Sequence, residues 1–466
     1  MRSSSCVVVA TLALLTAAAP VAAQTASPPP AGAPPAAAPP PAPAPAAPPA
    51  AGPAGPTAAP APAPAAAAPA APAATEATPA APAPGAAPPA SPAPAATPAP
   101  SVLDKISADA FVDAYGSFNA NGPKPQGPVA AAGVAVGGNS FRAFDVAEGF
   151  SVNWAGVNAS YAADPIGGTI GLRMGPGATL YNAGPDNAYG LQYVKQAYAT
   201  WKPADKLTLD FGKWDQPFGS EVADSQLNMN YSRSVLFWYM QPLFFTGLRV
   251  DYAATDQLDL KVFAANGWNN SIDNNRGKTF GAQVMFKPMD ALVLYLGYVG
   301  GPEQADFVVG PPMGGALALA GNVPDANSHW RHMVDFVADI NPTKELRFLL
   351  NADYRAEDSL PDAMGGTHNE SVYGANLVAR YAFSDAFSAA LRGEYYHDEH
   401  GDTLGTGTST DIEDGTLTLI YGVGNHLAFM LDGRMDFANN KIFQKNASDV
   451  TDNQFTATLG IIASTK

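Results

Sequence analysis

Residues 345–356, ELRFLLNADYRA, alternate between apolar and polar side chains over most of their length. Leu346, Phe348 and Leu350 share one parity, and Arg347 and Asp353 share the other. Successive side chains leave an extended strand on opposite faces, so this alternation predicts a β-strand with one apolar and one ionisable face. A fold built from such strands must place water on one side of its sheet and an apolar medium or core on the other.

The same pattern recurs along residues 101–466 and predicts an all-β chain of sixteen antiparallel strands. We expect strands at 108–119, 149–162, 167–175, 189–201, 206–214, 244–254, 257–267, 278–287, 291–300, 329–340, 345–356, 370–383, 386–398, 411–423, 427–437 and 452–464. Helical spacing is rare; residues 102–107 could form a single turn.

The connections between these segments alternate between short and long. Seven are short and rich in Pro, Asp, Asn and Gly, which supply turn chemistry: 163–167, 202–206, 254–257, 287–291, 341–344, 383–386 and 424–426. The connections between them are mostly long, such as 215–243 and 301–328. Alternating short and long connections around an even set of strands is typical of an outer-membrane β-barrel.

The two faces of the predicted strands differ sharply in polarity. The apolar face carries residues such as Leu296, Leu391 and Leu417, whereas the other face carries nine basic and nine acidic residues. These are Arg173, Asp210, Arg249, Asp251, Asp259, Lys261, Arg331, Asp335, Asp339, Arg347, Asp353, Arg355, Arg380, Arg392, Glu394, Asp432, Arg434 and Asp436. A soluble sandwich would turn this face outward. A transmembrane barrel turns it inward, because a basic residue facing lipid at the midplane costs about 2–4 kcal/mol.

Aromatic residues favour the transmembrane barrel over the sandwich. Trp201, Tyr252 and Phe286 lie beside short turns, and Tyr298 and Phe437 lie near the opposite strand ends. Two such bands are typical of the interfacial girdles of a membrane barrel. Two irregularities, a phase shift in strand 149–162 and Lys195 on the unexpected face of its strand, predict β-bulges.

The N-terminal part of the chain differs in composition from the rest. Residues 1–23 read as a secretory signal peptide that contains Cys6, the only cysteine. Residues 24–100 hold 28 of the 45 prolines and one charged residue, Glu76. We expect a disordered, polyproline-like periplasmic linker, either a passive tether or a rod that contacts peptidoglycan. The net charge of −16 belongs to residues 101–466, and this acidity argues against nucleic acid as a partner.

A sixteen-stranded barrel is too wide for side chains to fill, so its default content is water. Residues 215–243 form a long connection with several aromatic residues, such as Phe237 and Trp238, and we expect it to fold into the lumen. Glu221, Asp224 and Arg233 would then line the constriction with the charged wall residues named above. The alternative is that this connection caps the barrel outside and packs against a neighbouring protomer of a homo-oligomer.

Several stretches stand out between residues 110 and 255: FGKWDQPFGSE, NMNYSRS, QPLF and TGLRVDY, with DAYGSFN and NSFRAFD upstream. They resemble the OmpL-like β-barrel porin family of Gram-negative outer membranes. The matching positions are Phe211 to Lys213, Gly219, Glu221, Asn230 to Ser234, Pro242, Gly247 and Arg249. The resemblance implies a porin-like channel embedded in outer-membrane lipid. The Ala/Pro-rich linker and the C-terminal GIIASTK, which lacks a terminal aromatic residue, depart from the pattern.

The sequence therefore favours an outer-membrane porin for diffusion of small hydrophilic solutes or ions, with no enzymatic activity and no cofactor. A structural envelope tether anchored by the barrel and a barrel-scaffolded enzyme are the alternatives. In the stretch YHDEHGD, His397 and His400 with a carboxylate could bind a divalent cation. A solvated acidic loop is the favoured interpretation of that stretch, so we expect no metal site.

Overall fold

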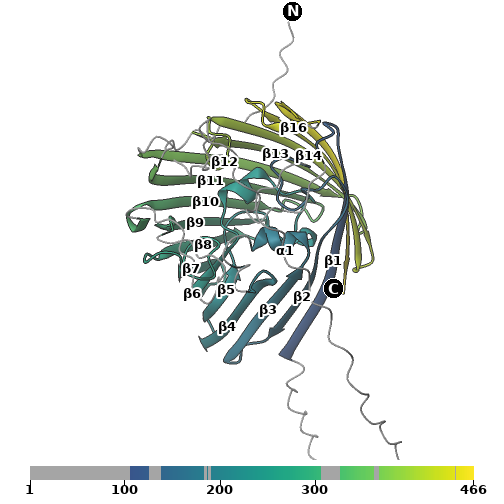
Figure 1. The fold of residues 1–466 in the computed structure, drawn as a ribbon. Helices are drawn as coiled ribbons and strands as arrows, with labels where there is room; N and C mark the ends of the chain where they lie inside the picture. Colours follow the sequence, from purple (N-terminus) through teal and green to yellow (C-terminus); the bar gives the residue numbers. More distant parts are fainter. Residues whose placement is uncertain are drawn as a thin grey trace, which may run out of the picture. The chain divides into compact units, whose positions relative to one another are not determined.

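The computed structural model describes residues 105–124, 138–182, 186, 190–305, 326–361, 367–446 and 448–465. Sixteen antiparallel strands form one closed barrel within this part of the chain (Figure 1). Their bounds are β1 Ile106–Asn119, β2 Gly149–Tyr161, β3 Ile166–Met174, β4 Val194–Ala204, β5 Leu207–Asp215, β6 Phe244–Thr255, β7 Leu258–Ala265, β8 Thr279–Met289, β9 Leu292–Pro302, β10 Trp330–Ile340, β11 Leu346–Pro361, β12 Thr367–Ala382, β13 Phe387–Asp398, β14 Thr410–Val423, β15 Leu427–Ala438 and β18 Asn453–Ser464.

The barrel closes because the last strand pairs with the first. Phe111 of β1 lies opposite Ser464 of β18, and the register continues to Asn119 opposite Thr456. Every other strand pairs with its two neighbours in sequence, and β15 pairs with β18. Closure leaves no sheet edge with unpaired backbone groups, which a membrane core requires. The predicted antiparallel barrel of sixteen strands is confirmed.

Side-chain exposure confirms which face points outward. Leu296, Leu391 and Leu417 are 55%, 58% and 49% exposed, while Arg392 and Asp432 on the other parity are each 1% exposed. A soluble protein shows the opposite distribution. The ionisable face therefore lines the inside of the barrel and the leucine face surrounds it. Among the described residues, no helix is long and apolar enough to span a membrane.

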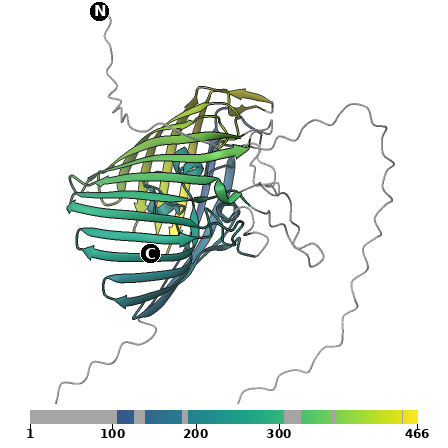
Figure 2. The ribbon, with the colours of Figure 1, turned by 90° about the vertical axis from the view of Figure 1, so that its left-hand side faces the viewer.

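The short connections join neighbouring strands at one end of the barrel, as predicted (Figure 2). The aromatic residues that were expected to form bands, such as Trp201, Tyr252 and Phe437, are each 45–49% exposed on the outer face. Because short turns face the periplasm in barrels of this type, the long connections belong to the cell exterior. The predicted signal peptide and linker, residues 1–100, lie outside the described residues.

Both strands with a predicted irregularity contain a β-bulge, but the bulge on β2 precedes Trp154, whereas the phase shift was expected between Trp154 and Val157. On β2, Trp154 lies opposite Asp113 and Val152 opposite Ala114, so Asn153 is an extra residue. On β4, Gln196 and Val194 lie opposite consecutive residues of β3, so Lys195 is extra in the same way. A bulge leaves one residue out of the ladder and can turn its side chain to the other face. Asn153 and Lys195 are each 1% exposed, inside the barrel.

Some elements differ from the predictions. Strand β4 begins at Val194 instead of 189, because residues 190–193 form a turn. The preceding connection also contains a short helix, α1 (Pro176–Tyr181), that begins at a proline. The predicted helical turn at 102–107 is wrong for its last two residues, which begin β1, and residues 102–104 lie outside the described part. A small hairpin, β16 (Phe443–Lys445) and β17 (Asp449–Thr451), was not predicted. Alternation over three residues is too short to detect.

Candidate functional site

Residues 216–243, which we call the inner segment, lie inside the barrel. The backbone N–H of Gly219 donates to Asp335 of β10 over 2.9 Å, and that of Ser232 donates to Asp432 of β15 over 2.8 Å. The Tyr231 hydroxyl donates to Asp113 of β1 over 2.8 Å. A single segment can reach inward-facing side chains of these three strands only from within the barrel. Figure 1 shows the helical turns of the segment enclosed by the strands.

The inner segment has little regular structure, and wall carboxylates satisfy its backbone donors. It contains a 3-10 turn, η2 (Ser225–Leu227), and a π-helical turn, η3 (Leu236–Met240). The first free N–H groups of η3, on Val235 and Leu236, donate to the two oxygens of Glu394 on β13 over 3.0 and 2.6 Å. A carboxylate at the N-terminus of a helical turn accepts otherwise unpaired donors. Glu394 therefore fixes both the position and the direction of this turn.

Apolar packing also fixes the segment. Leu236 and Met240 are fully buried in a cluster with Trp214, Phe218 and Phe263, which come from β5, from the segment itself and from β7. Phe245 and Phe263 stack with ring centroids 4.6 Å apart. Burying side chains of this size contributes about 1.5–3 kcal/mol each. The segment is therefore docked as a packed element and does not hang loosely in the lumen.

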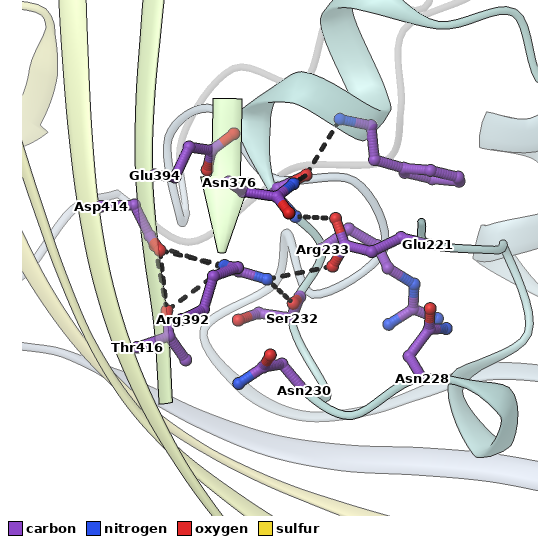
Figure 3. Close-up of polar contacts among 12 residues, drawn as sticks. Glu221, Asn228, Asn230, Ser232, Arg233, Asn376, Arg392, Glu394, Asp414 and Thr416 are labelled. Atoms are coloured by element: carbon purple, nitrogen blue, oxygen red, sulfur yellow. Dashed lines mark hydrogen bonds and ion pairs between the residues drawn. The ribbon is translucent and has the colours of Figure 1, made fainter. Parts of the chain in front are cut away.

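Arg392 of β13 is the centre of the polar contacts between wall and segment (Figure 3). Its side chain is fully buried and donates to Asp414 of β14 over 3.0 Å, to Glu221 over 3.1 Å and to the Ser232 carbonyl over 2.7 Å. Arg434 of β15 continues the network by pairing with Asp414 and donating to the Arg233 carbonyl over 2.6 Å. A guanidinium suits this position because its fork of donors can serve several acceptors at once.

A second buried network holds the other side of the segment. Asp224 accepts two hydrogen bonds from Arg173 of β3, over 3.0 and 2.9 Å, and lies 3.3 Å from the Lys195 amino group. Lys195 also pairs with Asp215 at the end of β5. Burial tends to raise the pKa of Asp224, but Lys195 and Arg173 outweigh it and lower that pKa. The bulge at Lys195 therefore supplies a cation that the regular alternation would have turned outward.

A third group of wall charges is only partly buried and lies at the strand ends beside the short turns. Arg249 pairs with Asp210 over 2.6 Å, and Arg347 pairs with Asp339 over 2.8 Å. Lys261 pairs with Asp251. The Arg347 side chain is 41% exposed, the largest value among these ion-paired wall charges. Among the described residues, none of these pairs forms a hydrogen bond with the inner segment, and their side chains are partly exposed, so they are the part of the wall that can meet water.

The sixteen predicted site residues fall into three groups. Glu221, Asp224 and Arg233 belong to the inner segment and are buried there. Six wall residues are buried, and each bonds the segment directly: Asp353, Arg355, Arg392, Glu394, Asp432 and Arg434. Seven are half-buried: Arg249, Asp251, Asp259, Lys261, Arg331, Arg347 and Arg380. That these residues line a conducting pore stays a prediction.

The structure adds residues that the prediction missed. Asp113 and Asp414 are buried inside the barrel. Asp113 bonds Tyr231 of the inner segment, and Asp414 pairs with Arg392. Both stand at inward-facing positions of their strands, two residues from Tyr115 and Thr416, so the alternation could have identified them. Among the large apolar residues of the inner segment, Leu227 and Val222 are the most exposed, at 70% and 37%. No sequence signal marks an exposed leucine in an irregular segment.

Two hollows adjoin the inner segment. A cavity of about 40 Å³ is enclosed by residues 220–221 and 227–230 of the segment and by Arg347, Leu349 and Val378 of the wall. A larger one, of about 500 Å³, is lined by Gln226 and Leu227 together with residues of β1, β2 and the turn at 424–426. Leu227 borders both hollows, so it separates them.

Comparison with known proteins identifies the family. The family model described as "Putative beta-barrel porin-2, OmpL-like" matches residues 105–464. Similar solved structures include OmpT of Vibrio cholerae (11% identity, 77% of this chain and 97% of that chain, TM-score 0.47) and an anion-selective porin from Comamonas acidovorans (10%, 77% and 99%, TM-score 0.47). OprB of Pseudomonas putida is 14% identical over 78% of this chain and 95% of that chain, with a TM-score of 0.47. No curated protein sequence matches the chain.

The family match covers the whole barrel, from the residue before β1 to the last residue of β18. It agrees with a closed barrel that has ionisable residues inside and leucine outside. The chain belongs to the OmpL-like β-barrel porin family of outer-membrane channels.

Proposed function

We propose that this porin is a narrow diffusion channel for small hydrophilic solutes and ions, with the inner segment as its constriction. The observation that carries the proposal is the polarity of the barrel wall. Ionised residues inside a closed barrel need water or ion partners, and an interior of sixteen strands is too wide for wall side chains alone to fill. The inner segment occupies part of that space, which leaves a narrow aqueous route.

The partly exposed charges indicate where this route runs. Arg249, Lys261 and Arg347, with their acidic partners, lie on β5–β7 and on β10 and β11, at the short-turn end. The charges that hold the segment, such as Arg392 and Asp414, are fully buried. Solute would therefore pass the half-exposed pairs and the apolar side chain of Leu227, and would not meet the Arg392 network directly.

The route has a balanced charge. Its half-exposed basic residues are Arg249, Lys261, Arg347 and Arg380, and its acidic residues are Asp210, Asp251, Asp259 and Asp339. Opposite charges facing the same water create a transverse field that orients polar solutes but does not reject either ion sign outright. We therefore expect a weak ion preference that single substitutions can change in either direction.

Planar-bilayer recording tests the proposal. Purified, folded protein should give discrete conductance steps, and its reversal potential in a salt gradient should show a weak ion preference. Arg249→Ala leaves Asp210 unpaired and should shift the reversal potential towards cations. Asp251→Asn leaves Lys261 unpaired and should shift it towards anions.

The control for both variants is Arg276→Ala, on the outer connection between β7 and β8, which should leave the reversal potential unchanged. Folded protein that never produces conductance steps would refute the channel. Steps with equal reversal potentials in all three variants would place the route elsewhere in the barrel. Liposome swelling with sugars of increasing size would then give the width of the route.

A further inference from the structure

A cluster of two histidines and two carboxylates lies at the end of the barrel that carries the long connections. His368 and Glu370 come from the start of β12, and His400 and Asp402 come from the connection between β13 and β14. One ligand atom from each of His368, Glu370 and His400 lies within 4.8 Å of the others. The two imidazole rings are 4.8 Å apart and nearly perpendicular. The sequence suggested His397 as the partner of His400, but His397 bonds Asp411 instead.

The spacing of the donor atoms fits a tetrahedral metal ion. His400 Nδ1 lies 3.2 Å from Glu370 Oε2, and His368 Nε2 lies 3.5 Å from the same oxygen. His368 Nε2 is also 3.6 Å from Asp402 Oδ2. Tetrahedral zinc with bonds of about 2.0–2.1 Å places its ligands roughly 3.3–3.4 Å apart. Three of the donor pairs therefore already have the separation that a shared metal ion would impose.

Glu370 provides a second, independent observation. Its side chain is fully buried, and its Oε2 atom has no hydrogen-bond partner although it faces both imidazoles. Its other oxygen accepts the backbone N–H of His400 over 3.1 Å. A buried carboxylate oxygen without a donor is costly unless a proton or a cation compensates it. The unpaired oxygen thus lies within 3.5 Å of a nitrogen of each histidine, where a cation could contact all three residues.

The connection that carries His400 is already held in place without a metal. The backbone N–H of Glu399 donates to the Ser371 carbonyl over 3.0 Å, and the Ser371 hydroxyl donates to Glu399 over 2.7 Å. The N–H of Leu404 donates to Asp398 over 2.9 Å. These bonds are separate from the four candidate ligands. They reduce the ordering cost of metal binding, because the ligands need little rearrangement.

We propose that His368, Glu370, His400 and Asp402 bind one divalent transition-metal ion, of which Zn²⁺ is the natural occupant. Two imidazole nitrogens and two carboxylate oxygens suit zinc and its first-row neighbours, whereas Mg²⁺ and Ca²⁺ prefer oxygen ligands alone. His368 and Asp402 are 27% and 13% exposed and His400 is 46% exposed, so an ion can enter from outside. Bound metal would join β12 to the β13–β14 connection at the mouth of the barrel.

Metal binding by the detergent-purified full chain tests the proposal. After chelation and dialysis, titration with Zn²⁺ against a competing fluorescent chelator should show one ion per chain. Co²⁺ in place of Zn²⁺ should give the visible absorption of a tetrahedral site. Loss of an outer-shell partner alone typically weakens metal binding 10–100-fold, so His368→Ala and His400→Ala should each weaken it by about 100-fold or more.

Two matched variants separate the site from general acidity. His397→Ala removes the neighbouring histidine, which bonds Asp411. Glu399→Gln removes a carboxylate outside the cluster, while the amide oxygen can still accept the hydrogen bond from the Ser371 hydroxyl. Both should retain wild-type affinity, while Glu370→Gln should lose it. Each protein is first checked for folding by its heat-modifiable migration on SDS gels, so that a collapsed barrel is not counted as a lost site.

Several outcomes would overturn the proposal. No stoichiometric binding of Zn²⁺ or Co²⁺ by folded wild-type protein would do so. Equal binding of Mg²⁺ and Ca²⁺, unaffected by His368→Ala and His400→Ala, would identify an acidic surface without a built site. Loss of binding in His397→Ala but not in His368→Ala would place the metal on the alternative pair of histidines.

Discussion

Replacing Arg392 by methionine removes the cation at the centre of the contacts between wall and inner segment. The methionine keeps most of the aliphatic volume but loses the bonds to Asp414, Glu221, Thr416 and the Ser232 carbonyl. Asp414 keeps Arg434 as a partner, whereas Glu221 keeps only the backbone N–H of Ser234. The substitution therefore leaves Glu221 as a buried carboxylate without a cation, and this weakens the attachment of the inner segment to the barrel wall.

The size of the effect follows from the burial of the pair. Breaking a buried ion pair by removing one partner typically costs about 3–5 kcal/mol. The variant should thus be destabilised by about 3–5 kcal/mol.

The assay is urea unfolding of the protein in lipid vesicles, followed by tryptophan fluorescence, alongside single-channel recording. We expect Arg392→Met to lower the free energy of unfolding and to raise conductance, because the segment detaches from β13. Arg347→Met is the matched control for the unfolding measurement: its side chain is 41% exposed, and such a pair contributes about 0–1 kcal/mol.

Adding Glu221→Gln to Arg392→Met completes a double-mutant cycle. The second change removes the stranded charge and should restore part of the lost stability at pH 7. The reasoning is refuted if Arg392→Met loses less than about 1 kcal/mol and conducts like wild type. It is refuted equally if Glu221→Gln does not reduce the loss, since the stranded carboxylate would then not be the cause.

Three further predictions concern single side chains. In Gly460→Ala the new methyl carbon would lie 2.1 Å from the Tyr231 ring, so we expect a loss of about 1–3 kcal/mol by urea unfolding; Gly433→Ala, with nothing within 4 Å, should be neutral. Leu227→Trp should lower single-channel conductance and Leu227→Ala should raise it, and equal conductances would show that Leu227 does not border the route. Burial raises the pKa of Glu303 to about 7, so its packing against Trp268 and Thr279 loses stability as pH rises from about 4.5 through 7; hydrogen exchange of residues 266–279 should show this loss in wild type and not in Glu303→Gln.

The alternation of residues along the strands determined the barrel. A period of two fixes which side chains share a face, and ionised residues cannot face lipid, so the inside and outside of β11 follow from ELRFLLNADYRA alone. The turn residues and the two bulges followed in the same way. Strand faces, turns and bulges are set by residues that lie close together along the chain, so they can be predicted from the sequence alone.

The tertiary structure alone decided which groups meet across the barrel. Arg392 and Glu221 are separated by 171 residues, and His368 at the start of β12 meets His400 in the connection between β13 and β14. Their contact depends on how the inner segment and the outer connections pack, where no periodic pattern applies. The same packing buried Glu221 and exposed Leu227. The alternation of residues shows which face of each strand meets lipid and which meets the barrel interior. Which side chains pair with each other in that interior depends on the closed three-dimensional arrangement.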